Sequence, residues 1–274
     1  GLFFFILWRN LKWVNLSKTE AMPIGALTGS APPNGFPFHW STKEITYLGM
    51  KIGPSLRKLV KLNLQPIITR IKEDLHRWGT LPVSWIGRIS VLKMNILPRL
   101  LYPLQMLPNS IPNSFFIDLD RMFTRFIWQG KKVRMKITKL QRSKDQGGLG
   151  VPNIRLYHWA AQMRYIYEWV NPDVTNTWID MESRNCGILS LKDCPFVNHK
   201  KVKLEVQNNL IVLNTLNTWN KIKVGFKLKK HFSLLAPIWR NPDFPPSCQD
   251  IVFRLWQESG LDRLAKLYEG GILD

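Results

Sequence analysis

The chain has 274 residues and an ordinary apolar fraction of 45%, so it is long enough to bury a sizeable core, and wholesale disorder is excluded. Its 39 Lys and Arg outnumber 19 Asp and Glu, and the net charge of +20 favours a polyanionic partner, nucleic acid before an anionic membrane surface. Three unevenly spaced cysteines without a C-x-x-C pair argue against a disulfide scaffold or a zinc site and indicate a reducing compartment.

Residues 1–54 are predicted to form short extended pieces joined by turns. The opening apolar run, residues 1–8, is too short to span a membrane, and we expect the chain to start in the middle of a larger polypeptide. Pro, Gly and Asn predict a loop at 31–37. Residues 45–52 are rich in β-branched and aromatic side chains and are followed by Gly53 and Pro54, which predicts a strand or hairpin.

Residues 55–129 change to a helical pattern. The first helix is predicted to end at Gly79 and Pro82, and Ser84 is the expected N-cap of the second. Asn113 or Ser114 is the expected cap of a third helix. The first helix carries one apolar stripe, made of Leu64, Ile67, Ile68, Ile71, Leu75 and Trp78. We expect Pro98, Pro103 and Pro108 to break up the second helix, and the three amphipathic helices to form a small bundle.

The remaining chain is predicted to be a basic connector, residues 130–152, followed by a helical region, residues 153–274. Helices are expected at 153–169 and roughly at 200–219 and 247–267, with a Pro-containing loop at 236–246. The glycine run 147–150 is interpreted as a turn rather than a phosphate loop, because no strand precedes it. The predicted fold class is therefore mainly α, with a small β-hairpin.

Positive charge is concentrated in one stretch that contains no Asp or Glu. Such a stretch suits a phosphate backbone, and the alternative is a solvated charged face. Aromatic residues also have two interpretations, since bases stack on them. For the phenylalanines of the third helix, and for Trp78, Trp85 and Trp128 near helix ends, we favour the core, whereas Tyr47 is expected to face a ligand. The stretch comprises Arg121, Arg125, Lys131, Lys132, Arg134, Lys136, Lys139, Arg142 and Lys144.

Motifs for catalysis are nearly absent from the sequence. Glu73 and Asp74 are the only adjacent acidic pair, and neighbouring helical residues diverge by about 100°, which suits a shared metal poorly. There is no P-loop, no G-x-S-x-G and no H-E-x-x-H, and the five histidines lack metal-ligand spacing. We therefore expect no catalytic residue and no cofactor for this chain.

Several short motifs, in order, resemble the reverse transcriptases of non-LTR (LINE-type) retrotransposons. Residues 47–50 (YLGM) look like the end of that family's palm. Its thumb is similar to residues 74–78 (DLHRW), 84–89 (SWIGRI) and 93–98 (KMNILP), followed by 126–128 (FIW) and 147–152 (GGLGVP). Residues 15–20 resemble the motif that follows the family's catalytic Asp-Asp, and residues 233–244 and 250–268 resemble the region beyond the thumb. The resemblance spans about residues 12–270, while residues 1–11 depart from it.

The resemblance implies a palm remnant at 1–54, a helical thumb at 55–129, the connector at 130–152 and a post-thumb region at 153–274. Members of the family copy RNA into DNA with two divalent metals, Mg²⁺, held by palm aspartates. This chain has no Asp-Asp pair, so the resemblance implies nucleic-acid binding without polymerisation. The alternatives are a free-standing nucleic-acid-binding protein derived from a transposon, and a subunit that completes a polymerase with a separate palm.

The expected partners are RNA, DNA or an RNA–DNA hybrid, and the palm and fingers of a parent polymerase; a membrane partner is not expected. The family resemblance assigns Tyr47, Leu48 and Gly49 to the primer-grip hairpin, and Arg88 and Lys93 to the thumb surface along the duplex. The expected location is nuclear, cytoplasmic or both. The full set of predicted nucleic-acid contacts is Tyr47, Leu48, Gly49, Arg77, Arg88, Lys93, Lys131, Lys132, Arg134 and Lys136.

Overall fold

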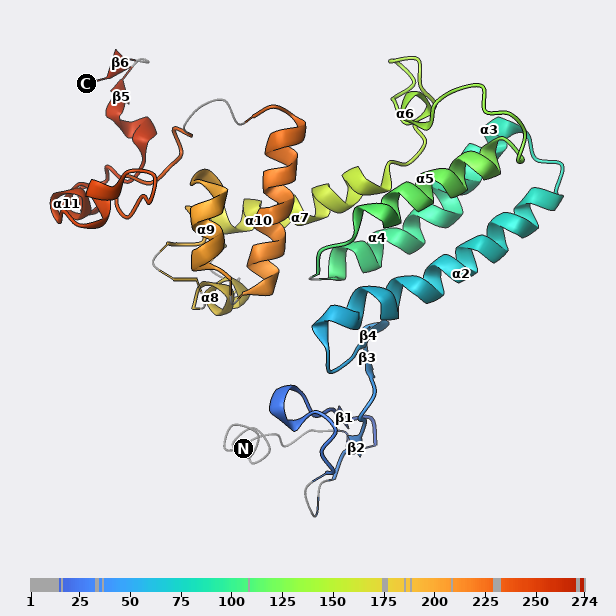
Figure 1. The fold of residues 1–274 in the computed structure, drawn as a ribbon, viewed down its shortest axis with the longest axis horizontal. Helices are drawn as coiled ribbons and strands as arrows, with labels where there is room; N and C mark the ends of the chain where they lie inside the picture. Colours follow the sequence, from blue (N-terminus) through green and yellow to red (C-terminus); the bar gives the residue numbers. More distant parts are fainter. Residues whose placement is uncertain are drawn as a thin grey trace. The chain divides into compact units, whose positions relative to one another are not determined.

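The protein is mainly helical, as predicted, with a few very short strands (Figure 1). This computed structural model describes residues 15, 17–32, 35, 37–107, 109–173, 177–184, 186–187, 189–207, 209–228, 233–269 and 272–273. The chain divides into two compact units, residues 1–76 and 77–274, and each is considered by itself. Among the helices of the described part, none combines the length and the apolar character needed to cross a bilayer.

The first unit contains the predicted hairpin. Strand β3 (Ile45–Tyr47) pairs antiparallel with β4 (Met50–Ile52), and Ile45 lies opposite Ile52. Leu48 and Gly49 join them with φ angles of 47° and 76°, the left-handed backbone of a tight two-residue turn. A leucine rarely adopts this conformation, so the turn is set by the strand pairing rather than by local preference.

Before the hairpin, β1 (Glu20–Ala21) pairs in parallel with β2 (His39–Trp40), and the 3₁₀ turn η1 (Gly25–Leu27) lies between them. The prediction of extended pieces joined by turns is thus confirmed for the described residues. The apolar run at 1–8, and residues 33, 34 and 36 of the predicted loop, lie outside them.

The first predicted helix is α2 (Leu59–Thr80), which follows the 3₁₀ turn η2 (Leu56–Lys58). The helix ends at Thr80, as the sequence predicted from Gly79 and Pro82. In its apolar stripe, Leu64, Ile71 and Leu75 are buried. Asn63, in its second turn, accepts from the Lys51 backbone N–H and donates to the Lys51 carbonyl, both at 2.8 Å. This side chain therefore fastens the hairpin to the helix.

The second predicted helix runs further than expected. It begins as α3 (Trp85–Val91), continues through the π-helical turn η3 (Leu92–Ile96) and ends as α4 (Leu97–Met106), with Pro98 and Pro103 inside it. The prediction that these two prolines break the helix was wrong; Pro108, the third proline of that prediction, lies outside the described residues. Pro98 stands in the first turn of α4, directly after the irregular π turn, where a missing N–H costs little. Pro103 is buried, and packing outweighs its local penalty.

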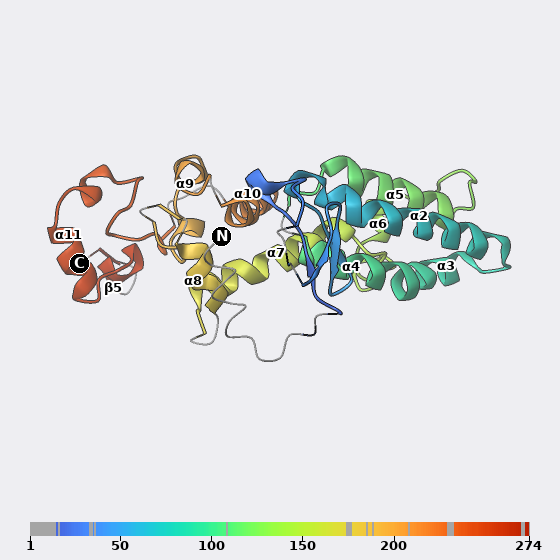
Figure 2. The same ribbon diagram turned by 90° about the horizontal axis from the view of Figure 1, so that it is seen from below.

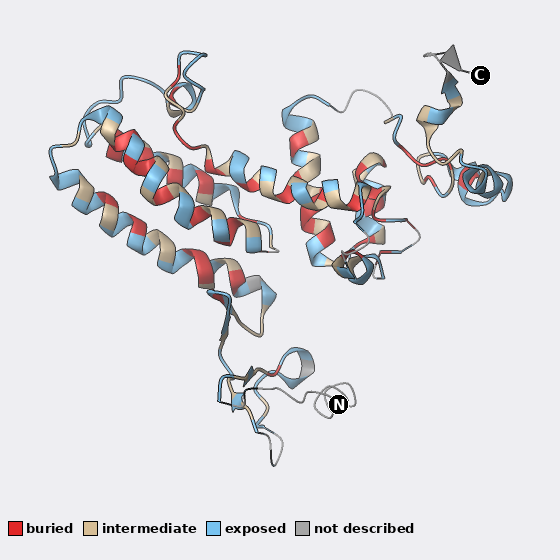
Figure 3. Ribbon diagram, turned by 180° about the vertical axis from the view of Figure 1, so that it is seen from behind, coloured by how far each residue is buried: buried red, intermediate tan, exposed pale blue. Residues whose placement is uncertain are grey.

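Helix α5 (Asn113–Ile127) contacts α3 and lies beside the continuous α3–α4 helix in Figure 1; Figure 2 shows the same helices after a quarter turn. Its N-cap is Pro112, without a side-chain hydrogen bond, so the predicted cap at Asn113 or Ser114 was wrong. The predicted core role of its aromatic residues is confirmed for Phe116, Phe123 and Phe126, whereas Phe115 is only partly covered. Figure 3 shows buried residues along this helix and along α4.

Helix α7 (Ile154–Val170) was predicted and connects two cores of the second unit. Asn153 caps it by accepting from the Leu156 N–H at 3.2 Å. Its first half contacts α4, where the buried His158 Nδ1 donates to the Leu104 carbonyl at 3.2 Å, so the ring is held as the Nδ1–H tautomer. Its second half contacts α10 (Leu210–Gly225).

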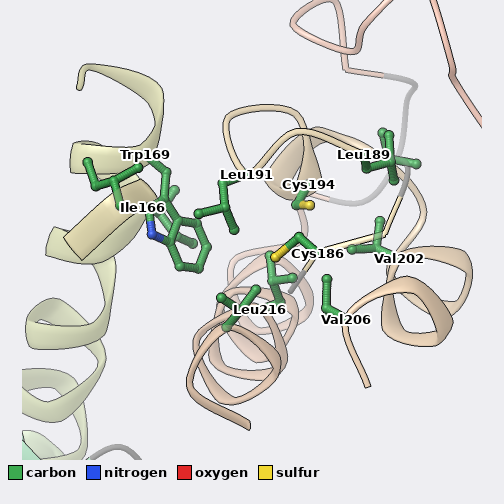
Figure 4. Close-up of a cluster of buried hydrophobic side chains, with 12 residues drawn as sticks. Ile166, Trp169, Cys186, Leu189, Leu191, Cys194, Val202, Val206 and Leu216 are labelled. Atoms are coloured by element: carbon green, nitrogen blue, oxygen red, sulfur yellow. The ribbon is translucent and has the colours of Figure 1, made fainter. Parts of the chain in front are cut away.

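The second core gathers α8 (Thr177–Ser183), the 3₁₀ turn η4 (Cys194–Phe196) and α9 (His199–Glu205) around α7 and α10. The helix predicted at 200–219 is two helices, because α9 ends at Glu205 and Asn209 caps the start of α10. Figure 4 shows this cluster: Ile166, Trp169, Ile179, Cys186, Leu189, Leu191, Cys194, Val197, Val202, Val206, Val212 and Leu216.

The last part of the chain is less helical than predicted. The helix expected at 247–267 is limited to α11 (Val252–Glu258), which follows the 3₁₀ turn η5 (Pro245–Cys248). A further 3₁₀ turn η6 (Leu264–Leu267) leads to β5 (Tyr268–Glu269), which pairs antiparallel with β6 (Ile272–Leu273). Ser259 and Gly260 end α11, and glycine's left-handed φ of 95° there stops the helix.

Candidate nucleic-acid interface

Arg88 was predicted to contact phosphate, but the structure buries it. Its side chain is 1% exposed. Nε donates to the Val83 carbonyl at 3.1 Å, Nη1 donates to the Phe126 carbonyl at 3.0 Å, and the guanidinium lies 5.4 Å from the Phe126 ring centroid. The residue ties the start of α3 to the end of α5, and its predicted role at the surface is corrected to a structural one.

Lys93 is also engaged within the protein. It is partly exposed, and its Nζ donates to the Leu149 carbonyl at 2.8 Å. That carbonyl belongs to the glycine run, so Lys93 fastens this run to the π turn η3. An ammonium group that already donates to a carbonyl of the chain has fewer N–H donors for a phosphate. The structure therefore does not support Lys93 as a principal nucleic-acid contact.

The glycine run itself is a turn, as predicted. Gly148 N–H donates to the Ser143 carbonyl at 2.9 Å, and Gly150 N–H donates to the Arg142 carbonyl at 2.8 Å. A Cβ at position 148 would lie 2.1 Å from the Arg142 oxygen, so only glycine fits there. These N–H groups are occupied by carbonyls of the chain, and a phosphate cradle would need them to point outward.

The predicted hairpin residues are accessible in the first unit. Tyr47 is 63% exposed and Leu48 is 66% exposed, at the tip where Gly49 completes the turn. Arg77, in the last turn of α2, is exposed and belongs to the second unit.

The remaining predicted cations lie on one continuous exposed segment. Lys131, Lys132, Arg134 and Lys136 follow α5, and all four are exposed. The neighbouring Arg125, Lys139, Arg142 and Lys144 are exposed as well. Within residues 109–173, which the structure describes without a gap, none of these eight side chains forms an ion pair; Arg121 alone of the nine does, with Asp118 at 3.1 Å. We call residues 125–144 the basic segment.

Backbone hydrogen bonds hold the two ends of the basic segment. At the end of α5, Gln129 and Gly130 take left-handed φ angles of 53° and 72°, and Gly130 N–H donates to the Arg125 carbonyl at 3.0 Å. Further on, α6 (Ile137–Leu140) is anchored by Leu140, which is fully buried. The Leu140 carbonyl accepts from Leu149 and Val151 at 3.1 and 3.0 Å. The cations are thus carried on a backbone segment that is held by hydrogen bonds at both ends.

An open groove of about 610 Å³ lies between α5 and the basic segment. Arg125 and Lys131 supply positive charge there, and Ile117, Val133 and Ile137 supply apolar surface. Asp120 also lines the groove, and its carboxylate accepts from the Gln141 side chain at 3.0 Å. Burial raises the pKa of Asp120, opposed by this hydrogen bond and by the attraction of Arg155. The groove therefore offers cations and apolar surface with one oriented acceptor.

Trp85 and Trp128 were predicted to belong to the core, and neither is fully buried: Trp128 is partly covered, and Trp85 is more exposed. Trp85, the first residue of α3, is 43% exposed. Its ring stacks on that of Trp128, with centroids 5.9 Å apart and planes at 20°. The sequence signal for this exposure is its place directly after the Ser84 cap, in a first helical turn, where the buried stripe has not yet begun.

The basic segment is thus the stronger candidate site, whereas the hydrogen bonds of Arg88 and Lys93 hold the neighbouring elements together. A comparison of the chain with models of known protein families found no match.

Proposed function

We propose that this chain binds RNA, DNA or an RNA–DNA hybrid through phosphate contacts made by the basic segment. The observation that carries the proposal is a set of eight exposed cations that form no ion pair within the part of the chain that the structure describes, on a backbone held at both ends. Unpaired cations favour a polyanion because each phosphate contact releases condensed counterions. Contacts of this kind position a nucleic acid without reading its sequence.

On the motifs given above, we propose that the chain derives from a non-LTR reverse transcriptase. We also propose that this chain alone has no polymerase activity. The family's Mg²⁺ ions need paired palm aspartates, and the sequence contains no adjacent Asp-Asp. The residues present do not fit that metal site, so no catalytic step is assigned to it.

The test compares two variants that lose the same charge. One replaces Lys131, Lys132, Arg134 and Lys136 by Gln. The other replaces four exposed cations elsewhere in the second unit, Lys200, Lys203, Lys221 and Lys227, by Gln. Fluorescence anisotropy with a labelled RNA–DNA hybrid, over ~50 to ~200 mM salt, gives the affinity and its salt slope.

We expect the wild-type affinity to fall steeply with salt. The basic-segment variant should bind more weakly, with a slope smaller by about one for each lost phosphate contact. The control variant should keep most of the wild-type slope. Equal losses in both variants would show that binding follows net charge alone and would refute the assignment to the basic segment.

A further inference from the structure

The stacked pair of Trp85 and Trp128 lies where the basic segment begins. Trp128 is the C-cap of α5, and its carbonyl accepts from the Lys131 N–H at 2.9 Å. Lys131 therefore starts within one turn of the aromatic pair. Trp85 is 43% exposed, which leaves apolar ring area in contact with water beside cations that form no ion pair among the described residues.

The aromatic pair is held rigidly from behind. Arg88 donates to the carbonyl of Val83, two residues before Trp85, and to the carbonyl of Phe126, two residues before Trp128. The same side chain thus fixes both backbone segments that carry the two rings. A backbone that is already held in place loses little conformational freedom when a ligand binds to the side chains it carries, which favours binding.

Resting on the proposed function, we propose that this end of the helical bundle binds an unpaired nucleic-acid strand, with one base stacked on Trp85 and the adjoining phosphates on Lys131 and Arg125. Stacking needs an open base face, which a single strand or an overhang provides and the interior of a duplex does not. Arg125 precedes Trp128 by three residues at the end of α5, and the Lys131 N–H donates to the Trp128 carbonyl, so these two cations provide the neighbouring positive charge.

The charge of this region favours nucleic acid over a protein partner. Arg125 and Lys131 are exposed and have no ion-pair partner among the described residues. An acidic peptide would satisfy the cations but would leave the Trp85 face without a planar group to stack on. An acidic polypeptide therefore serves as the competing occupant in the test.

The test uses the full chain and an oligonucleotide of about 12 nucleotides, within the usual length of a single-strand site. The oligonucleotide carries 2-aminopurine, whose fluorescence is quenched by stacking. It is offered as a single strand, as an overhang on an RNA–DNA hybrid, and as a blunt hybrid. We expect quenching in the first two forms only.

Trp85→Ala should abolish the quenching and weaken single-strand binding by about tenfold, the change typical of one lost stacked base. Its affinity for the blunt hybrid should stay unchanged, and Trp85→Phe should restore most of the loss. On the wild-type chain, 5-iodouracil in the single strand should cross-link to Trp85 on illumination, which tests the contact even if an alanine variant does not fold.

Four outcomes decide the matter. Quenching and a cross-link at Trp85 support the inference. Blunt-hybrid binding without either of them overturns the inference and leaves the proposed function standing. Competition by polyglutamate as effective as that by the oligonucleotide shows a general polyanion surface and overturns the inference. Absence of binding to every nucleic acid refutes the proposed function itself.

Discussion

Replacing Arg88 by Ala should destabilise the second unit rather than remove a phosphate contact. The substitution leaves the Val83 carbonyl without its 3.1 Å donor and removes one donor from the Phe126 carbonyl. A buried acceptor that loses its donor costs about 1–3 kcal/mol, and the Val83 carbonyl is only partly buried, so its cost lies toward the lower end of that range. The Phe126 oxygen keeps a backbone donor, Gln129 N–H at 3.3 Å. The cost of removing the Arg88 donor from this oxygen therefore lies at the low end of that range.

Two further contributions oppose each other. Loss of the guanidinium from above the Phe126 ring, and of the buried stem, adds to the destabilisation. In the other direction, Nη2 is buried without a hydrogen-bond partner, so its removal relieves a cost. We expect a net loss of about 3 kcal/mol in the free energy of unfolding, equivalent to about 10 °C in Tm for a unit of this size.

Urea unfolding followed by circular dichroism measures this loss. Arg88→Met keeps the apolar stem and removes only the donors, so it should lose less than Arg88→Ala. Lys132→Ala, at an exposed position, serves as the control and should change the free energy of unfolding by less than about 0.5 kcal/mol. If Arg88→Ala unfolds at the wild-type urea midpoint but binds nucleic acid weakly, the guanidinium reaches the ligand and the structural role is refuted.

Three further predictions concern other parts of the second unit. Gly148→Ala places a Cβ 2.1 Å from the Arg142 oxygen and should cost about 1–3 kcal/mol, measured by urea unfolding. Burial lowers the pKa of His158 below its ordinary 6.5. Below about pH 6.5 the unfolded chain therefore binds a proton at this side chain that the native state does not bind, and the free energy of unfolding should fall as the pH drops. His158→Gln should flatten this dependence in urea midpoints taken between about pH 7 and about pH 5; an unchanged dependence would contradict the assignment. Burial raises the pKa of Cys186 to about 11, and we expect only the exposed Cys248 to react rapidly with Ellman's reagent in the native chain; fast reaction of a second thiol would show that the core cluster opens.

Local chemistry in the sequence was enough to predict much of the secondary structure. The hairpin at 45–52, the end of α2 and the Ser84 cap follow from turn residues, breakers and a hydroxyl at the right position. The turn at 147–150 follows from its glycines. Such signals depend on neighbours in the chain, and they hold wherever packing does not oppose them.

Packing overruled these local signals at the prolines and in the later helices. Pro98 and Pro103 remain inside a continuous rod because the π turn and burial compensate for them. The helix expected at 247–267 shrinks to α11, which buries no residue, so its apolar side chains find no core to extend it.

Composition and order along the chain determined that a run of cations without acids exists, and hence where a polyanion is to be sought. Only the tertiary structure decided which cations remain available. Arg88 and Lys93 have the same charge as Lys131 and Arg134, but carbonyls from distant segments accept their hydrogen bonds. Likewise, Trp85 is exposed although its large apolar ring suits a core. Whether a charged or aromatic side chain serves the fold or a ligand depends on contacts across dozens of residues, which no local pattern records.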